Sequence, residues 1–245
     1  MKRTHNILIT REITDDQLAL AQNLGLNVLV EPAIEIEFRD NWLSVQSTLK
    51  EIETPVFVFT SQNGVEAFDR FRKAGVEFPE KMKVYAVGEK SAKRLKEIGI
   101  DAIIPEKQTG VGLAKKIISD VEDSDEIKNP TVLHFCGDRR RDELRQLLTD
   151  AEFKVKDVVV YKTILNQMEF RDANYDAVLF FSPSAVQAYR EGGGFRRGKH
   201  PELFAIGTTT AEELSIESGR HVHISPKPGT ETLLKFTAQI LNDGG

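Results

Sequence analysis

Four short polar clusters in this sequence each follow an apolar run and precede a helical pattern. They are Thr60–Gly64, Gly88–Ser91, Ser182–Ser184 and Gly207–Thr210. The start of a helix offers unpaired backbone N–H groups and the positive end of the helix dipole, and both favour anions. A Ser or Thr there also caps its helix, which is the more frequent role of any single residue. Four such clusters together favour a ligand with several carboxylates or phosphates.

The candidate binding residues lie in these clusters, together with one cation just past the first expected strand. They are Arg11, Ser61, Gln62, Asn63, Gly88, Ser91, Ser182, Pro183, Ser184, Gly207, Thr208, Thr209 and Thr210. Ligands of open α/β sheets bind beyond the carboxyl ends of the strands, where these residues are expected. No cluster matches GxxxxGK[ST] or GxGxxG, so a nucleotide is not indicated.

Tyr161 is the candidate catalytic residue. It is a lone phenol in Val158–Ile164 (VVVYKTI), a β-branched run that predicts a buried strand. A buried tyrosine is more often a packed ring with a satisfied hydroxyl than a catalyst. A phenol with an ordinary pKa of about 10 can, however, donate a proton or hydrogen bond at neutral pH. Its position between two copies of a repeated pattern gives the two interpretations equal weight.

Other reactive side chains are weaker candidates. His221 and His223 alternate on one expected strand without a carboxylate or cysteine at ligand spacing, so no metal site is predicted. His134 and Cys136 lie in an apolar strand and are expected to pack there. The run Arg139–Arg141, flanked by acids, is interpreted as a solvated turn. No Ser-His-Asp arrangement can be defended from the sequence.

Bulk composition excludes several classes of protein. The 245 residues are 40% hydrophobic, enough for a full core, and carry a net charge of −5. That acidity argues against a non-specific nucleic-acid binder but permits a local anion site. A single cysteine, Cys136, allows no internal disulfide and fits a reducing compartment. No run approaches the roughly 18 apolar residues of a membrane span, and the start does not resemble a secretion signal. A cytoplasmic location is expected.

Short apolar runs alternate with helical patterns along the whole chain. Strands are expected near residues 6–10, 27–30, 34–38, 55–60, 84–88, 100–104, 131–136, 158–164, 177–181, 203–207 and 221–225. Helices are expected between these strands. One of the helices is Arg39–Ile52, with a buried stripe of Trp42, Val45, Leu49 and Ile52. Runs such as VFVFT and AVLFF lack polar alternation, so helices should cover both sheet faces. That pattern predicts parallel sheets built from βαβ units.

The order of these elements contains a repeat. FTSQNGVEAF resembles FFSPSAVQAY, YAVGEKSAKRL resembles FAIGTTTAEEL, and PEKQTGVGLAKKI resembles PKPGTETLLKF. The paired segments are all about 120 residues apart and occur in the same order, which chance rarely produces. The first strands, through IEIEF, match the segment from TVLHFC to YKTIL more loosely. Two similar α/β halves with a cleft between them are predicted.

These motifs together resemble the uroporphyrinogen-III synthase family. The resemblance rests on ILITR, FTSQNGVEAF, VYAVGEKSAKRLKEIGI, VVVYKT, FFSPSAVQA, AIGTTTAEEL and KPGTETLL, which span nearly the whole chain. It implies an α/β fold of two similar domains, each a parallel β-sheet flanked by helices, joined by a two-stranded antiparallel connection. Domain 1 would be discontinuous, 1–34 plus 166–245, and domain 2 would be 39–159. The connecting strands would be 35–38 and 160–165.

The resemblance also implies an activity in tetrapyrrole (heme) biosynthesis. A hydro-lyase of this family closes the linear tetrapyrrole hydroxymethylbilane to uroporphyrinogen III, with loss of water and inversion of ring D through a spiro intermediate. It implies no cofactor and no metal. A monomer is the default expectation, and the composition argues against nucleic-acid and membrane partners. Tyr161 matches the family's tyrosine, which would help hydroxide leave ring A. Family positions near the cleft correspond to Ser61, Ser91, Ser182, Thr209 and Thr210.

Two rival hypotheses come from other classes. One is a non-enzymatic two-lobed sensor or binding protein for a tetrapyrrole or another anion. Such a sensor usually carries an added output domain, and none fits in this length. The other is a sugar-nucleotide transferase, which would need an acidic metal-binding pair or a nucleotide loop.

Overall fold

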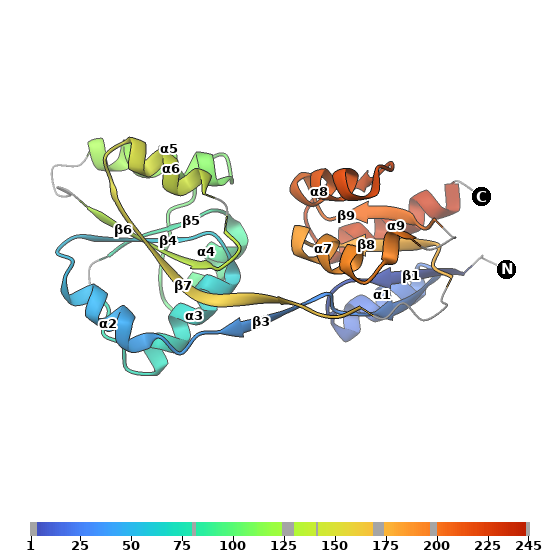
Figure 1. Cartoon of the computed structure of the whole chain (residues 1–245), viewed down its shortest axis with the longest axis horizontal. Helices are drawn as coiled ribbons and strands as arrows, with labels where there is room; N and C mark the ends of the chain where they lie inside the picture. Colours follow the sequence, from blue (N-terminus) through green and yellow to red (C-terminus); the bar gives the residue numbers. More distant parts are fainter. Residues whose placement is uncertain are drawn as a thin grey trace. The chain divides into compact units, whose positions relative to one another are not determined.

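The computed structural model describes residues 4–79, 82–123, 130–140, 142–168, 174–196 and 200–243. Contacts divide the chain into two compact units (Figure 1). Unit 1 contains Met1–Glu35 and Ile164–Gly245, and unit 2 contains Ile36–Thr163. Unit 2 is therefore inserted in the sequence of unit 1. Among the described residues, no helix combines the length and the apolar character that a membrane crossing requires.

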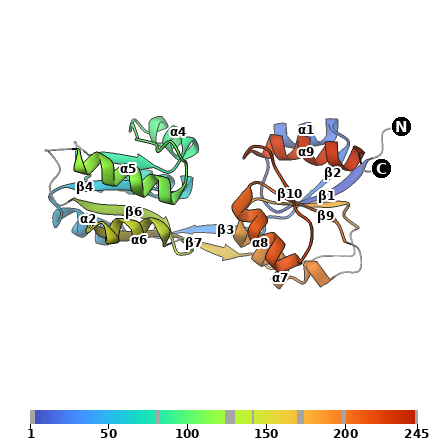
Figure 2. The same ribbon diagram turned by 90° about the horizontal axis from the view of Figure 1, so that it is seen from above.

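Unit 1 is a parallel sheet with helices on both faces. Its strands are β1 (His5–Ile9), β2 (Leu26–Val30), β8 (Ala177–Phe180), β9 (Glu202–Ala205) and β10 (His223–Ile224), in the order β10-β9-β8-β1-β2. Its helices are α1 (Asp15–Asn23), α7 (Pro183–Glu191), α8 (Thr208–Ser218) and α9 (Thr230–Asp243), with a short 3₁₀ turn at Gly194–Arg196. One core cluster packs α1 and α9 on the sheet, and another packs α7 and α8 on the opposite face (Figure 2).

Unit 2 has the same layered construction. Its strands are β3 (Ile34–Phe38), β4 (Pro55–Phe59), β5 (Lys83–Ala86), β6 (Thr131–Gly137) and β7 (Lys154–Leu165), in the order β3-β7-β6-β4-β5. Its helices are α2 (Trp42–Lys50), α3 (Gln62–Lys73), α4 (Glu89–Glu97), α5 (Gly110–Glu122) and α6 (Glu143–Asp150). Helices α2, α3 and α4 pack on one face, and α5 and α6 pack on the other.

The sequence repeat corresponds to a repeat in topology. The order β2-β1-β8-β9-β10 of unit 1 matches β7-β6-β4-β5 of unit 2, followed by a parallel bridge between Tyr85 and Ile103 where β10 would lie. Ser61 and Ser182 take equivalent positions as N-caps of α3 and α7. The expectation of parallel sheets flanked by helices is confirmed.

Strand β3, which the sequence repeat matches loosely to the second half of β7, pairs with that same strand. The amide of Arg39 donates to the carbonyl of Val160, and the amide of Asn166 donates to that of Ala33, both at 2.9 Å. The residue bonded to β7 moves back from Arg39 to Ala33 as the position in β7 advances from Val160 to Asn166, so the two strands are antiparallel. Alongside Val155–Val159, a cavity that is also lined by Ser44, Val45 and Thr48 of helix α2 borders β7.

Three sequence-based expectations were wrong in detail. Helix α2 begins at Trp42 rather than Arg39, and Trp42 is 39% exposed, so the predicted stripe reaches the core through Val45, Leu49 and Ile52 but not through Trp42. The expected strand at 100–104 is reduced to the bridge at Ile103. The β7 strand is half-buried rather than buried, because side chains in both its halves are exposed, among them Lys156, Lys162 and Ile164. The acidic segment 124–129 lies outside the described residues.

Candidate active site

Strands β4 and β7 of unit 2, which lie on either side of β6, bring Ser61 and Tyr161 together. Ser61 lies two residues beyond the last residue of β4 and caps α3, where its Oγ accepts a hydrogen bond from the amide of Gly64 at 3.1 Å. Tyr161 lies near the carboxyl end of β7. Its Oη is 3.0 Å from Ser61 Oγ. Two of the residues predicted from sequence are therefore in direct contact.

A close backbone approach fixes the Tyr161 ring. The pairing of β6 with β7 shifts register between Cys136 and Gly137, so that Gly137 lies opposite Tyr161. A Cβ atom on Gly137 would lie 2.4 Å from the ring carbon Cε2. Phe38 of β3 contacts the ring edge-on, with 6.4 Å between centroids. Glycine at position 137 therefore leaves the space that the phenol occupies.

The surroundings keep the Tyr161 phenol protonated. Burial is the largest influence and raises its pKa above the usual value near 10, while the hydrogen bond with Ser61 partly opposes the shift. Ser61 already accepts from Gly64, so its own proton can point to the tyrosine oxygen. In that arrangement the phenolic proton is free to be donated elsewhere. The pair can act as a hydrogen-bond or proton donor at neutral pH.

The other predicted residues of unit 2 divide by exposure. Gln62 is exposed and Asn63 half-buried in the first turn of α3, whereas Ser91 is only 4% exposed. Gly88 caps α4 with extended backbone, and the Gln108 side chain accepts from the amide of Glu89 at 3.3 Å. Ser91 is thus buried beneath this turn and supports it. Gln108, which was not among the predicted site residues, already accepts from one backbone amide of the turn, that of Glu89.

Unit 1 carries the remaining predicted residues at the carboxyl ends of adjacent strands. Ser182 caps α7 through its Oγ, which accepts from the amide of Ala185 at 3.2 Å, and Gly207 caps α8 without a side-chain bond. The residues at these two helix starts with at least partial exposure are Ser182, Pro183, Ser184, Gly207, Thr208 and Thr209. Thr210 is 3% exposed, so it packs beneath the turn.

Arg11 lies at the same edge of the unit 1 sheet, after β1. Its guanidinium carbon is 5.3 Å from the centroid of the Phe181 ring, and its Nε donates to the carbonyl of Glu12 at 3.2 Å. Among the described residues it has no carboxylate partner. An exposed guanidinium held by an aromatic ring, beside capped helix starts, suits an anionic group.

A buried polar chain crosses the sheet of unit 2, and sequence analysis missed it. Thr60 Oγ1 is 2.9 Å from His134 Nε2, and His134 Nδ1 is 3.0 Å from Asp157 Oδ1. Asp157 Oδ2 contacts Arg140 at 3.0 Å and also pairs with Arg145. The side chains of His134 and Asp157 are 3% and 5% exposed. His134 therefore makes hydrogen bonds as well as packing, and Arg140 pairs with the buried Asp157 carboxylate instead of being a solvated charge. Arg141 lies outside the described residues.

The hydrogen bonds assign the protons in this chain. A carboxylate only accepts, so His134 Nδ1 carries a proton and Nε2 faces the Thr60 hydroxyl. Burial by itself raises the pKa of Asp157, but the hydrogen bonds from His134 and Arg145 outweigh it and hold that pKa well below its usual range. Asp157 is therefore a permanent anion, and it fixes the His134 ring and, through it, Thr60.

One group of side chains in the described residues has metal-ligand geometry. Ligand atoms of His134, Cys136 and Asp157 lie within 4.8 Å of one another. Burial, with the nearby Asp157 charge, raises the pKa of Cys136 to about 12, so the thiol holds its proton. Both Asp157 oxygens are already engaged by cations or by His134. A metal would have to displace two guanidinium groups, so the arrangement fits a hydrogen-bond chain better.

Comparisons with known proteins agree with this fold. A family model described as uroporphyrinogen-III synthase HemD matches residues 16–235. The uroporphyrinogen-III synthase of Saccharomyces cerevisiae is 28% identical over 169 residues, which make up 62% of this chain and 62% of the yeast protein. The chain thus matches less than two thirds of that relative's length.

Two solved structures share the architecture at low identity. A mutant uroporphyrinogen III synthase from Thermus thermophilus has a TM-score of 0.70 and 17% identity, covering 98% of this chain and 100% of that one. The uroporphyrinogen-III synthetase of Helicobacter pylori has a TM-score of 0.65 and 17% identity, and the match covers 97% of this chain and 100% of that one.

Fold and site together define a class of α/β proteins in which a sheet-and-helix unit occurs twice and polar turns end the strands. Within that class, the family model covers most of the sequence, so the chain belongs to the uroporphyrinogen-III synthase family.

Proposed function

We propose that this protein cyclises hydroxymethylbilane to uroporphyrinogen III, with loss of water and inversion of ring D, in tetrapyrrole biosynthesis. The observation that carries the proposal is the Tyr161–Ser61 pair at a strand end of unit 2, with the two oxygens 3.0 Å apart. Family membership supplies the substrate class. The pair supplies a protonated phenol for the departing hydroxyl group.

The chemistry assigned to Tyr161 is assistance to the first bond cleavage. The C–O bond of the hydroxymethyl group breaks, and the oxygen leaves as water once it has received a proton. Tyr161 can donate that proton or a strong hydrogen bond, while Ser61 stabilises the tyrosine oxygen. The cation left on the tetrapyrrole is then free to react with ring D. Conformational control by the protein decides whether that ring inverts.

Binding of the carboxylate side chains is assigned to the polar turns of both units. Helix starts at Ser61, Gly88, Ser182 and Gly207 offer backbone N–H groups, and Arg11 offers a full positive charge. Ser91 and Thr210 are buried and support the turns instead of touching the ligand. Units 1 and 2 correspond, in this proposal, to the two domains of the family.

The deciding experiment is a product analysis. Purified protein is incubated with hydroxymethylbilane, and the type III and type I isomers are separated after oxidation. An excess of type III product above the spontaneous background is expected. Pure type I product at the spontaneous rate would contradict the proposal and would favour a binding protein without catalysis. The proposal includes a monomer that acts in the cytoplasm, and light scattering tests the monomer.

A further inference from the structure

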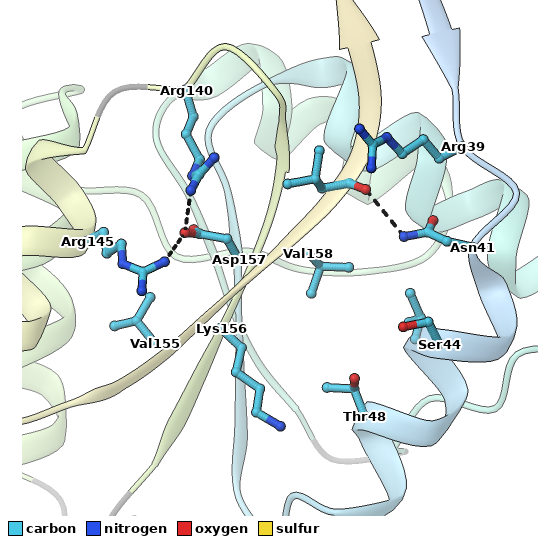
Figure 3. A pocket seen from close by; sticks show the side chains of 12 residues that line it. Arg39, Asn41, Ser44, Thr48, Arg140, Arg145, Val155, Lys156, Asp157 and Val158 are labelled. Atoms are coloured by element: carbon cyan, nitrogen blue, oxygen red, sulfur yellow. Dashed lines mark hydrogen bonds and ion pairs between the residues drawn. The ribbon is translucent and has the colours of Figure 1, made fainter.

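A cavity of about 550 Å³ lies beside the free edge of β7 in unit 2 (Figure 3). Helix α2 forms one wall with Ser44, Val45 and Thr48. The first half of β7 forms the floor, and Arg140 and Arg145 approach from the other side of the strand. The cavity exists because β3 pairs with only the second half of β7. Its described lining includes neither Tyr161 nor Ser61, so it is separate from the candidate active site.

The lining is strongly cationic. It includes Arg39, Arg140, Arg145 and Lys156 against one carboxylate, Asp157, among the described lining residues. Asp157 is already engaged by Arg140, Arg145 and His134. Lys156 makes only a long contact of 3.5 Å with Glu51, whose side chain is 67% exposed. Positive charge therefore exceeds negative charge at this surface.

Two guanidinium groups of the cavity have buried donors without acceptors. The Nε atoms of Arg39 and Arg140 are inaccessible to solvent and have no hydrogen-bond partner in the described structure. Arg39 also has no carboxylate within ion-pair distance among the described residues. A buried donor without an acceptor costs free energy, and a charged donor costs more than a neutral one. An oxyanion would satisfy these donors and offset the excess charge.

We propose that this cavity is a binding site for a small multivalent oxyanion, a phosphate group or a polycarboxylate. Arginine side chains recognise both groups through paired N–H donors. Ser44 and Thr48 add hydroxyl groups at the same wall. Asn41 is not counted among the donors, because its Nδ2 already donates to the carbonyl of Val159 at 3.3 Å and its Oδ1 is a buried acceptor without a partner in the described structure. The volume accommodates more than a single phosphate, so the oxyanion can be part of a larger molecule.

Calorimetric titration near neutral pH and at low ionic strength tests the site, with inorganic phosphate in one arm and tricarballylate in the other. Saturable binding of at least one probe is expected. The probe that binds with the higher affinity identifies whether the site prefers a phosphate group or a polycarboxylate. Arg39→Gln should weaken that binding by about tenfold or more, since it removes a charge-assisted donor. Lys156→Gln should weaken it by a smaller factor. Lys156 is 46% exposed, so this variant keeps the test valid if Arg39→Gln fails to fold.

Lys50→Gln is the matched control, because Lys50 lies at the end of α2, is exposed, and does not line the cavity. Its affinity for the probe should equal that of the wild type. In an amide NMR titration, the Asn41 side chain and residues 155–159 should shift more than the helix starts at Ser61 and Gly88. The proposal is overturned if neither probe saturates, if Lys50→Gln weakens binding as much as Lys156→Gln, or if the shifts concentrate at Ser61 and Gly88.

Discussion

At the scale of single residues, the Tyr161 hydroxyl is the group on which the proposed chemistry depends. Its environment does two separate things. Burial keeps the phenol protonated, and Ser61 orients it. Because both effects act on one oxygen, replacing that oxygen alone tests them without disturbing the ring.

Tyr161→Phe should lower turnover of hydroxymethylbilane by about 10–100-fold and leave the fold intact, because it removes one proton or hydrogen-bond donor and keeps the packed ring. Some activity should remain, since the substrate can lose water unaided. Tyr85→Phe is a matched control: Tyr85 is fully buried in the same unit and donates to Asp120 at 3.1 Å, on the α5 side of the sheet. The Tyr85→Phe variant should be less stable than the wild type but should turn over hydroxymethylbilane at the same rate. Wild-type turnover in Tyr161→Phe would remove the phenol from the mechanism.

The second residue-scale prediction concerns Asp157. Asp157→Asn should lower the free energy of unfolding by about 2 kcal/mol, a figure that allows for the partial exposure of Arg140 and Arg145. The pKa of Asp157 is lowered in the folded state, so its contribution is complete above the ordinary aspartate value of about 3.9. It is lost as the pH falls from there through the lower folded-state pKa.

Urea unfolding measured at a series of pH values from neutral to acidic checks the predicted loss of the Asp157 contribution to stability. Wild type should lose stability in acid more steeply than Asp157→Asn, whose side chain does not titrate. The variant Asp101→Asn, at an exposed position in the same unit, should keep the wild-type slope. Parallel curves for wild type and Asp157→Asn would contradict the assignment of a permanent anion.

At the scale of secondary-structure elements, the start of α3 combines a structural and a chemical role. Ser61 caps the helix and also contacts Tyr161. Thr109 caps α5 in the same way, since its hydroxyl accepts from the amide of Gly112 at 3.0 Å, but it does not contact Tyr161. Ser61→Ala and Thr109→Ala should each destabilise unit 2 by about 1 kcal/mol. Only Ser61→Ala should also slow turnover. Equal turnover in the two variants would reduce Ser61 to a capping residue.

The register shift between β6 and β7 gives a second element-scale test. Gly137→Ala places a methyl group where the Tyr161 ring lies, so the ring must move and turnover should fall about as far as in Tyr161→Phe. Combining the two substitutions should add little further loss, since both act on one group. Gly110→Ala should be tolerated, because its nearest neighbour would be Leu144 at an ordinary 3.8 Å. Fully additive losses would show that Gly137 acts independently of Tyr161.

The features that depend on local pattern could be predicted from the sequence. Apolar runs, capping residues and the repeat were sufficient for the parallel sheets and for the polar turns at strand ends. The hydrogen-bond chain from Thr60 to Asp157 could not be predicted, because it depends on register: His134 and Asp157 become neighbours only when β6 and β7 pair. A histidine and an aspartate at single positions of two apolar strands were the available signal. The burial of Ser91 and Thr210 likewise depends on how each helix rotates against its sheet.

At the scale of the whole molecule, each core cluster formed by the described residues lies within one unit. Two of these clusters belong to unit 1 and two to unit 2. Leu214→Ala in unit 1 and Phe68→Ala in unit 2 each remove a fully buried side chain, and each should cost about 3 kcal/mol or more. Calorimetry should show two transitions, and each substitution should lower only one of them. A single transition lowered equally by both would show that the two units unfold together.

The insertion of unit 2 within unit 1 has a consequence for synthesis on the ribosome. Unit 2 ends at Thr163, before β8, β9 and β10 of unit 1 have been translated. The first two strands emerge early, yet β1 needs β8 as its neighbour and must wait for it. The nascent chain therefore completes its middle portion first and closes the flanking sheet last, so the early N-terminal strands are the segment most exposed to chaperones and proteases.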